Sequence, residues 1–332
     1  MIWNELPKSF TELEPYELSD FFEPLTLCRV EGEKDEWVFL SVMLHGNEPS
    51  GLRVAQEILK KYNGKPPRGL ILLIGNVVAA KNGSRRLDDQ PDYNRIWLGG
   101  EGFEFDRAQD VLNELKKIHF FAGVDIHNNT GKNPPYGCIN RLDKKLAQLA
   151  KRFSKNCVYF INPMEVLSHR LAAMMTGMTI ECGLPNDKEQ EKNAFRFVDQ
   201  LLHLDRLAEV TPRADEINIY HSYTKLLIPD ACTVSFTGDT STDFSFFPHF
   251  DELNFQSVKV GESIGLVNNE KAKIIVLDEK GEDRSSEYFT YEEGVIRFKK
   301  SCVPSMFTKD VRVIHQDCLG YLMEELSVEL LK

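Results

Sequence analysis

Short apolar runs alternate with amphipathic stretches through the first two thirds of this chain. Residues 37–44, 69–78 and 120–126 are apolar runs of the kind that form buried strands. Apolar residues recur at helical spacing in the stretches between them, at 51–62 and 106–118. Strands that alternate with helices in this way predict an α/β fold, with a mainly parallel mixed sheet covered by helices on both faces.

This alternation continues to about residue 212 and then stops. Before that point we expect further helices and short strands at 143–153, 158–161, 178–180 and 188–208. After it, strand-like runs alternate with turn signals, and the expected strands lie at 217–228, 233–236, 273–277 and 311–314. We therefore predict two domains, an α/β domain over residues 1–212 and a smaller β-rich domain over residues 213–332.

The composition limits the classes of protein to which the chain can belong. Its 332 residues include 40 Lys and Arg against 51 Asp and Glu, which gives a net charge of −11. Because nonspecific nucleic-acid binding needs a basic face, we expect no nucleic-acid partner. The apolar runs are too short to span a bilayer, and the first 20 residues lack the basic start and apolar core of a signal peptide.

The cysteines also indicate the compartment. There are seven, an odd number, and no two have C-x-x-C spacing. This pattern is typical of reduced thiols in a reducing compartment, so we predict a cytoplasmic protein with no membrane partner. The sequence leaves the oligomeric state open, a homo-oligomer included.

The strongest local signal is a histidine and a glutamate three residues apart, His45 and Glu48, directly after the first predicted strand. An imidazole and a carboxylate on a turn that leaves a strand can reach one metal ion. A solvated histidine, followed by a glutamate in the first turn of the next helix, would give the same pattern.

A second histidine, His127, follows the predicted strand at 120–126. In open α/β sheets, ligands bind at the carboxyl ends of the strands, where His45, Glu48 and His127 are all expected to lie. Two histidines and one glutamate are the ligand set of a catalytic zinc site, which leaves the fourth position for water.

Two more motifs supply chemistry that such a site needs. Glu181 ends a short apolar strand, where a carboxylate could take a proton from water, although a strand-end salt bridge would look the same. Asn94 and Arg95, which follow Arg85 and Arg86, offer amide donors and a planar guanidinium that suit a substrate carboxylate. Ordinary solvated loops also contain such arginines.

Taken together, the motifs resemble those of the succinylglutamate desuccinylase/aspartoacylase family, which belongs with the zinc carboxypeptidases in fold and metal site. They occur in that family's order and approximate spacing, as His45-x-x-Glu48, Asp92-Tyr93-Asn94-Arg95, Asp125-Ile126-His127 and Ile180-Glu181-x-Gly183. The resemblance implies a zinc-binding catalytic α/β domain followed by a smaller β domain. It also implies that His45, Glu48 and His127 hold one zinc ion, and that Glu181 is the general base and then the acid.

The resemblance further implies how the substrate is held. Asn94 and Arg95 would bind the carboxylate of the amino-acid half, and Arg170 a further substrate carboxylate. Either Arg85 or Arg86 would polarise the scissile carbonyl; we assign that catalytic role to Arg86 and substrate binding to Arg85. The family's aspartoacylases also use a tyrosine of the second domain, for which Tyr288 and Tyr291 are the candidates.

These inferences favour a zinc-dependent amidohydrolase that cleaves the amide bond of a small anionic N-acyl amino acid. N-acyl-aspartate and N-succinyl-glutamate are the two types of substrate expected. The same zinc site would serve a carboxypeptidase-like peptidase acting on small peptides, and a non-catalytic zinc-binding protein is a further alternative. The presence of Glu181 argues against that last alternative, because binding zinc does not require this carboxylate.

Overall fold

The computed structural model describes residues 2–332, which form two compact units. The first unit comprises the chain up to Asn128 together with Pro135–Asn218 and Ser327–Lys332. The second comprises Asn129–Pro134 and Ile219–Leu326. The units are therefore not two consecutive halves of the chain, whereas the sequence predicted a single boundary between residues 212 and 213.

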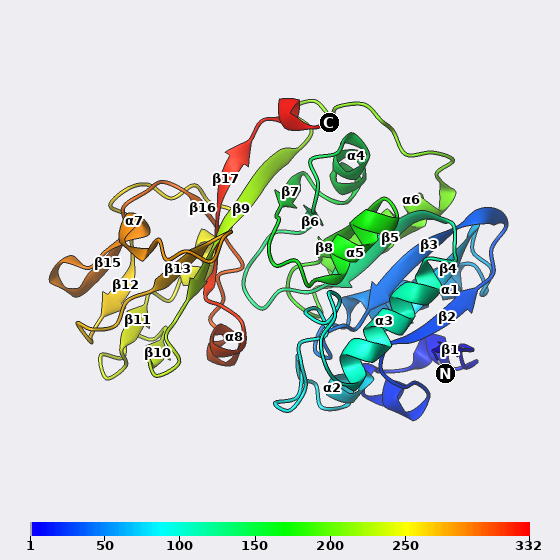
Figure 1. The fold of residues 1–332 in the computed structure, drawn as a ribbon, viewed down its shortest axis with the longest axis horizontal. Helices are drawn as coiled ribbons and strands as arrows, with labels where there is room; N and C mark the ends of the chain where they lie inside the picture. The colour runs from blue at the N-terminus through cyan, green and yellow to red at the C-terminus, as the bar shows by residue number, and fades with distance from the viewer. Residues whose placement is uncertain (1) are drawn as a thin grey trace. The chain divides into compact units, whose positions relative to one another are not determined.

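The first unit is built on a mixed sheet that is parallel at its centre (Figure 1). Its strands lie in the order β1-β2-β4-β3-β5-β8-β6-β7. In chain order they are β1 Trp3–Asn4, β2 Thr26–Val30, β3 Lys34–Val42, β4 Arg68–Ile74, β5 Phe120–His127, β6 Tyr136–Ile139, β7 Asn156–Tyr159 and β8 Gly177–Glu181. The neighbours β4, β3, β5 and β8 run parallel, whereas β2 and β6 are antiparallel to β4 and β8. The predicted mainly parallel mixed sheet is confirmed.

Helices cover both faces of this sheet, because the central strands carry apolar residues on both faces and both must be buried. The helices are α1 Ser50–Lys61, α2 Val77–Lys81, α3 Phe103–Leu115, α4 Lys144–Phe153, α5 Leu167–Met174 and α6 Lys188–His203. α3 and α5 share one buried cluster with Phe39 of β3 and Ile71 of β4. α1 packs on the opposite face, where Gly51 lies against Val42 and Ile126.

The last residues of the chain belong to the first unit, as a short 3-10 helix at Val328–Leu330 and its flanks. The backbone N–H of Lys332 donates to the carbonyl of Leu142 at 2.9 Å. The N–H of Lys144 in turn donates to the carbonyl of Lys332 at 3.2 Å. The chain terminus is thereby held beside the start of α4.

The second unit is β-rich and contains antiparallel pairings and a small separate sheet. Strand β9 (Asn218–Leu227) pairs with β13 (Ile275–Asp278) and β17 (Gly320–Leu326), and β17 pairs with β16 (Val303–Ser305). The separate sheet has the order β10-β11-β12-β15-β14, with bounds Val234–Ser235, Phe244–Phe246, Ser263–Val267, Val295–Phe298 and Phe289–Thr290.

Helices and aromatic side chains complete the second unit. The α-helices are α7 (Ser285–Tyr288) and α8 (Val311–Gln316). The expected strand at 311–314 is thus wrong: Asp310 accepts a hydrogen bond from the N–H of Val313 and caps a helix there. Within the buried cluster of this unit, the rings of Phe250 and Phe307 stack with their centroids 4.3 Å apart.

Short 3-10 helices at Phe10–Glu12, Pro15–Asp20, Phe250–Leu253 and Glu292–Gly294 complete the described secondary structure. Across residues 2–332, no helix combines the length and the apolar character needed to cross a membrane.

A buried arginine at the start of β4 joins three parts of the first unit. The side chain of Arg68 is 2 % exposed and lies over the ring of Phe121, 3.9 Å from its centroid. Nη2 donates to the carbonyl of Leu204, just beyond α6, at 2.7 Å, and Nη1 donates to the carboxylate of Glu36 at 3.2 Å. This one side chain therefore ties the end of α6 to the edge of the sheet.

We expect Arg68→Met to destabilise the protein by about 1–3 kcal/mol, because it leaves a buried carbonyl without its donor. Urea unfolding followed by circular dichroism measures this as a lower midpoint with an unchanged slope. Lys192→Met is the matched control, since Lys192 pairs with Glu189 at an exposed position and should change the stability by less than about 0.5 kcal/mol. Equal midpoints for the two variants would contradict the role given to Arg68.

Candidate metal centre and active site

The turn that follows β3 places the first two candidate ligands. β3 ends at Val42 and α1 begins at Ser50, so His45 and Glu48 lie on the connection between them. Gly46 lies so close to α2 that a Cβ on it would come within 2.2 Å of the backbone nitrogen of Ala80. Its own N–H donates to the carbonyl of Arg85 at 3.1 Å. The glycine thus allows the turn to pack against α2, and this packing orients the side chains of His45 and Glu48.

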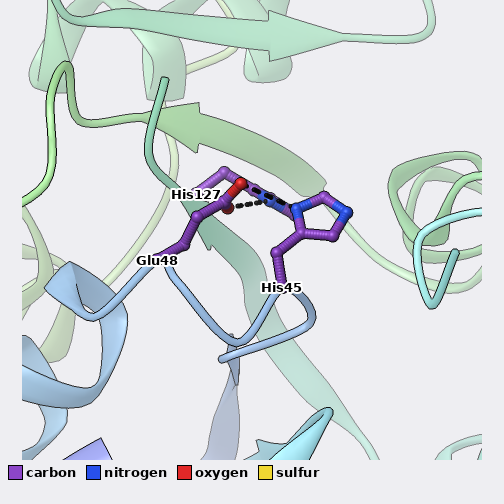
Figure 2. A group of neighbouring side chains, drawn as sticks. All are labelled: His45, Glu48 and His127. Carbon is purple, nitrogen blue, oxygen red and sulfur yellow. Dashed lines mark hydrogen bonds and ion pairs between the residues drawn. The ribbon is translucent and has the colours of Figure 1, made fainter. Parts of the chain in front are cut away.

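The third candidate ligand comes from the neighbouring strand. His127 is the last residue of β5, which pairs in parallel with β3. Because parallel strands end at the same edge of a sheet, His127 is brought to the turn that carries His45 and Glu48. The structure therefore assembles the three predicted ligand residues in one place (Figure 2).

The carboxylate of Glu48 lies between the two imidazoles. Oε1 is 2.8 Å from Nδ1 of His45, and Oε2 is 2.7 Å from Nδ1 of His127. One ligand atom from each residue lies within 4.8 Å of the other two, and each side chain is only 3 % exposed. Figure 2 shows both rings turned toward this carboxylate, so a single ion could contact all three groups.

Each imidazole is oriented from behind by a second carboxylate. Nε2 of His45 is 2.9 Å from Oδ1 of Asp92, and Nε2 of His127 is 2.9 Å from Oδ2 of Asp125. A histidine that binds a metal typically donates its other ring N–H to a carboxylate in this way. Oδ1 of the fully buried Asp125 has no hydrogen-bond partner among the described residues. This donor set fits a divalent cation.

The electrostatics agree with that fit. Burial alone would raise the pKa of the Glu48 carboxyl, but the charges of His45 and His127 outweigh burial and lower it. Burial would lower the pKa of His127, yet the carboxylates of Asp125 and Glu48 hold it well above its usual range. In the same way, His45 and Arg85 overcome burial and keep the pKa of Asp92 well below its usual value. The site thus stabilises ionised carboxylates and positive charge between them.

A carboxyl group of the opposite character lies next to this cluster. Glu181 ends β8 and is in register with His127 on β5, so the two side chains point to the same face of the sheet. Glu181 is 8 % exposed. Burial raises its pKa to about 8; the charge of His127 opposes this rise and that of Glu48 adds to it. A carboxyl group with a raised pKa suits proton transfer near neutral pH.

The two neighbouring arginines have different environments. Nη2 of Arg85 donates to Oδ2 of Asp92 at 3.0 Å, and Nη1 lies 3.4 Å from Oε1 of Glu48. Nη1 of Arg86 instead donates to the backbone carbonyls of Leu87 and Gln90. The structure therefore brings Arg85 to the cluster, whereas the contacts of Arg86 are with its own loop.

The predicted carboxylate-binding residues lie on two segments. Oδ1 of Asn94 accepts from the N–H of Leu167 at the start of α5, and Nδ2 lies 3.4 Å from Nε2 of His127. Nη1 of Arg95 donates to the carbonyl of Asn94 at 3.0 Å. Arg170 lies on α5, and its Nε has no hydrogen-bond partner among residues 2–332.

The candidate tyrosines belong to the second unit. The hydroxyl of Tyr291 accepts from the N–H of Ile274 at 2.9 Å. The hydroxyl of Tyr288 accepts from Nζ of Lys300 at 3.4 Å. The structure thus gives both hydroxyls partners within their own unit.

The sequence motifs do not predict that Asp92 and Asp125 contact the two histidines. One signal was available, because Asp125 precedes His127 by two residues and alternate residues of a strand share a face. Asp92 carried no such signal, because it lies in a loop 47 residues from His45 in sequence. Its role depends on how the loop before α3 folds back.

No protein family model matches the chain, and no curated protein matches it in sequence. Solved structures do match it. The fold is that of the succinylglutamate desuccinylases and aspartoacylases. A succinylglutamate desuccinylase/aspartoacylase from Rhodobacter sphaeroides has 14 % identity and a TM-score of 0.61, covering 91 % of this chain and 90 % of its own.

Two further structures of this fold show the same extent of likeness. Murine aminoacylase 3 has 17 % identity and a TM-score of 0.59, covering 92 % of this chain and 97 % of its own. The succinylglutamate desuccinylase from Chromobacterium violaceum has 14 % identity and a TM-score of 0.56, covering 89 % and 87 %. The desuccinylase/aspartoacylase fold thus extends over nearly the whole chain, and at these identities the likeness establishes the fold.

We expect Asp125→Asn to weaken binding of a divalent metal by about 10- to 100-fold, because the amide orients His127 less firmly than the carboxylate does. Isothermal titration with zinc or cobalt measures the affinity. Asp143→Asn is the control, since the side chain of Asp143 caps α4 by accepting from the N–H of Leu146. Unchanged affinity in Asp125→Asn would show that this carboxylate does not support a metal ligand.

Proposed function

We propose that this protein is a zinc-dependent amidohydrolase that cleaves the amide bond of an N-acyl amino acid. The products would be a carboxylate and a free amino acid. The observation that carries the proposal is the buried His45, Glu48 and His127 cluster with Glu181 in register beside it. Solved structures of the same fold are named as desuccinylases, aspartoacylases and an aminoacylase, which supports the same reaction class.

Zinc is the cofactor that this ligand set suits best, with His45, Glu48 and His127 as its protein ligands. When bound there, zinc supplies a Lewis acid for the amide carbonyl and makes a water molecule more acidic. Asp92 and Asp125 hold the two imidazoles in the orientation that presents Nδ1. We assign one zinc ion to each chain.

Glu181 would move the proton. Its carboxylate oxygen would accept a proton from the attacking water and then deliver it to the nitrogen of the departing amine. Its position beside His127 and its raised pKa suit both halves of that transfer. A protein that only binds zinc has no need of this carboxyl group, so the residue favours an enzyme over a metal carrier.

The arginines would recognise and polarise an anionic substrate. Arg85 lies beside Glu48, so we assign it the stabilisation of charge that develops on the carbonyl oxygen. This replaces the assignment of Arg86 to that role, because the contacts of Arg86 are with its own loop. Arg95 would bind the α-carboxylate, and Arg170 would bind a second carboxylate of the N-acyl-aspartate or N-succinyl-glutamate type.

The proposal includes the cytoplasm as the location. The seven cysteines are an odd number and no two have C-x-x-C spacing, a pattern that is typical of reduced thiols in a reducing compartment.

A panel of substrates tests the activity. We expect the zinc-loaded protein to hydrolyse N-acetyl-aspartate or N-succinyl-glutamate about 10- to 100-fold faster than N-acetyl-leucine, because a charge-assisted contact to a second carboxylate is worth roughly 1.5–3 kcal/mol. Release of the free amino acid is measured as kcat/KM, before and after removal and return of zinc. A preference for neutral N-acyl amino acids would contradict the acidic substrate. Faster cleavage of small unmodified peptides would favour the peptidase alternative.

We expect Glu181→Gln to lower kcat by at least roughly 100-fold, because the amide has nearly the same shape but cannot accept a proton. Zinc content, measured by elemental analysis, should stay at one ion per chain. The control is Gln148→Glu, which introduces the reverse change on α4, where the side chain donates to the carbonyl of Val210. Near-normal turnover in Glu181→Gln would remove this residue from the mechanism.

A further inference from the structure

The amide of Asn94 links the candidate metal centre to the helix that carries Arg170. Oδ1 accepts a hydrogen bond from the backbone N–H of Leu167 at 3.0 Å. On its other side, Nδ2 lies 3.4 Å from Nε2 of His127. The side chain therefore spans from a candidate ligand to the first residue of α5.

The start of α5 needs a partner from elsewhere in the chain. The first N–H groups of a helix have no carbonyl partner inside the helix. Val166, which occupies the N-cap position, has an apolar side chain and makes no capping hydrogen bond. Asn94 supplies the missing acceptor from a distant loop, so the fold uses it in place of a local cap.

Apolar packing also holds the loop that carries Asn94 against the start of α5. Tyr93, just before Asn94, and Trp97, three residues after it, are buried in one apolar cluster with Leu167 and Leu171 of α5. The backbone N–H of Trp97 donates to the carbonyl of Glu165 at 3.1 Å, two residues before the helix. The loop and the helix start are therefore held together by apolar packing and by two hydrogen bonds.

The far side of α5 is also closely fitted. A Cβ on Gly177 would come within 2.6 Å of the side chain of Leu171, so α5 sits directly on β8. A Cβ on Gly123 would come within 2.6 Å of the sulfur of Met175, just beyond the helix. With the sheet below and Asn94 at its start, α5 has little freedom to shift along its axis.

We propose that Asn94 is a positioning residue for α5 and, through it, for Arg170. Arg170 lies three residues after Leu167, one turn further along the helix. Nε of Arg170 has no hydrogen-bond partner among the described residues. The position of the α5 backbone therefore determines where the side chain of Arg170 begins. The inference rests on the proposed function in one respect only, namely that Arg170 meets a substrate carboxylate. Nε2 of His127 is directed at Asp125, so the N–H groups of Nδ2 can still bind the α-carboxylate.

Hydrogen exchange and substrate preference together test this role. In Asn94→Ala, peptides covering residues 165–175 should exchange roughly two- to tenfold faster in the zinc-loaded protein, because the N–H of Leu167 loses its acceptor. The ratio of kcat/KM for N-acetyl-aspartate or N-succinyl-glutamate to that for N-acetyl-leucine should fall roughly tenfold. A residue that only binds the α-carboxylate would weaken all of these substrates alike and leave the exchange unchanged.

Asn94→Asp is the conservative rescue, because its carboxylate still accepts from the N–H of Leu167. It should restore slow exchange at the start of α5 and the ratio between the substrates, whatever its absolute rate. Asp143→Ala is the matched control. It removes the cap of α4, because Oδ1 of Asp143 accepts from the N–H of Leu146 at 3.0 Å. It should speed exchange at α4 and leave the substrate ratio unchanged.

Two results would overturn the proposal. One is unchanged exchange across residues 165–175 in Asn94→Ala. The other is faster exchange with an unchanged substrate ratio, which would make Asn94 an ordinary cap with no effect on Arg170. The exchange measurement requires no turnover. An enzyme that hydrolyses no member of the panel would therefore count against the proposed function, whereas unchanged exchange would count against the positioning role.

Discussion

The placement of one carboxylate, that of Glu48, between two imidazoles is the constraint on which the rest of the site depends. The carboxylate is 3 % exposed, and a buried charge is costly unless opposite charge and hydrogen bonds surround it. Nδ1 of each histidine and the N–H of Asn128, which donates to Oε2 at 3.1 Å, provide those partners. The turn after β3 and the end of β5 must therefore meet at one point, and the parallel pairing of these strands brings them there.

The groups around Glu48 and the two histidines are themselves paired with opposite charges. Asp92 and Asp125 fix the far nitrogens of the rings, and Arg85 lies against Asp92 and Glu48. Glu181 differs because burial outweighs the charge of His127 there and raises the pKa of its carboxyl group. Glu48, with a lowered pKa, and Glu181, with a raised pKa, thus have opposite protonation preferences within one site. Pairs of this kind are typical of acid–base catalysis.

The sequence predicted the parts of this arrangement that follow from periodicity. Residues after buried parallel strands meet at one sheet edge, so the sequence alone groups His45, Glu48, His127 and Glu181. Loop geometry has no such rule: nothing in the pair Arg85-Arg86 indicates which guanidinium turns toward Glu48, and Asp92 reaches His45 only through the folding of its loop. Local capping was also decisive at Asp310, where α8 replaces an expected strand. Asn94 was predicted from its motif, but its contact with α5 depends on tertiary packing.

The division of the chain between the two units has a consequence for the order in which the protein can fold. Residues 129–134, which directly follow the end of β5, belong to the second unit, where Oδ1 of Asn254 accepts from the N–H of Phe307 and Nδ2 donates to the carbonyl of Lys132. The first unit in turn needs Lys332, whose backbone pairs with Leu142 and Lys144. A ribosome that has made the first 218 residues has therefore not yet made every part of the first unit. Completion of that unit during synthesis must wait until the whole second unit has emerged.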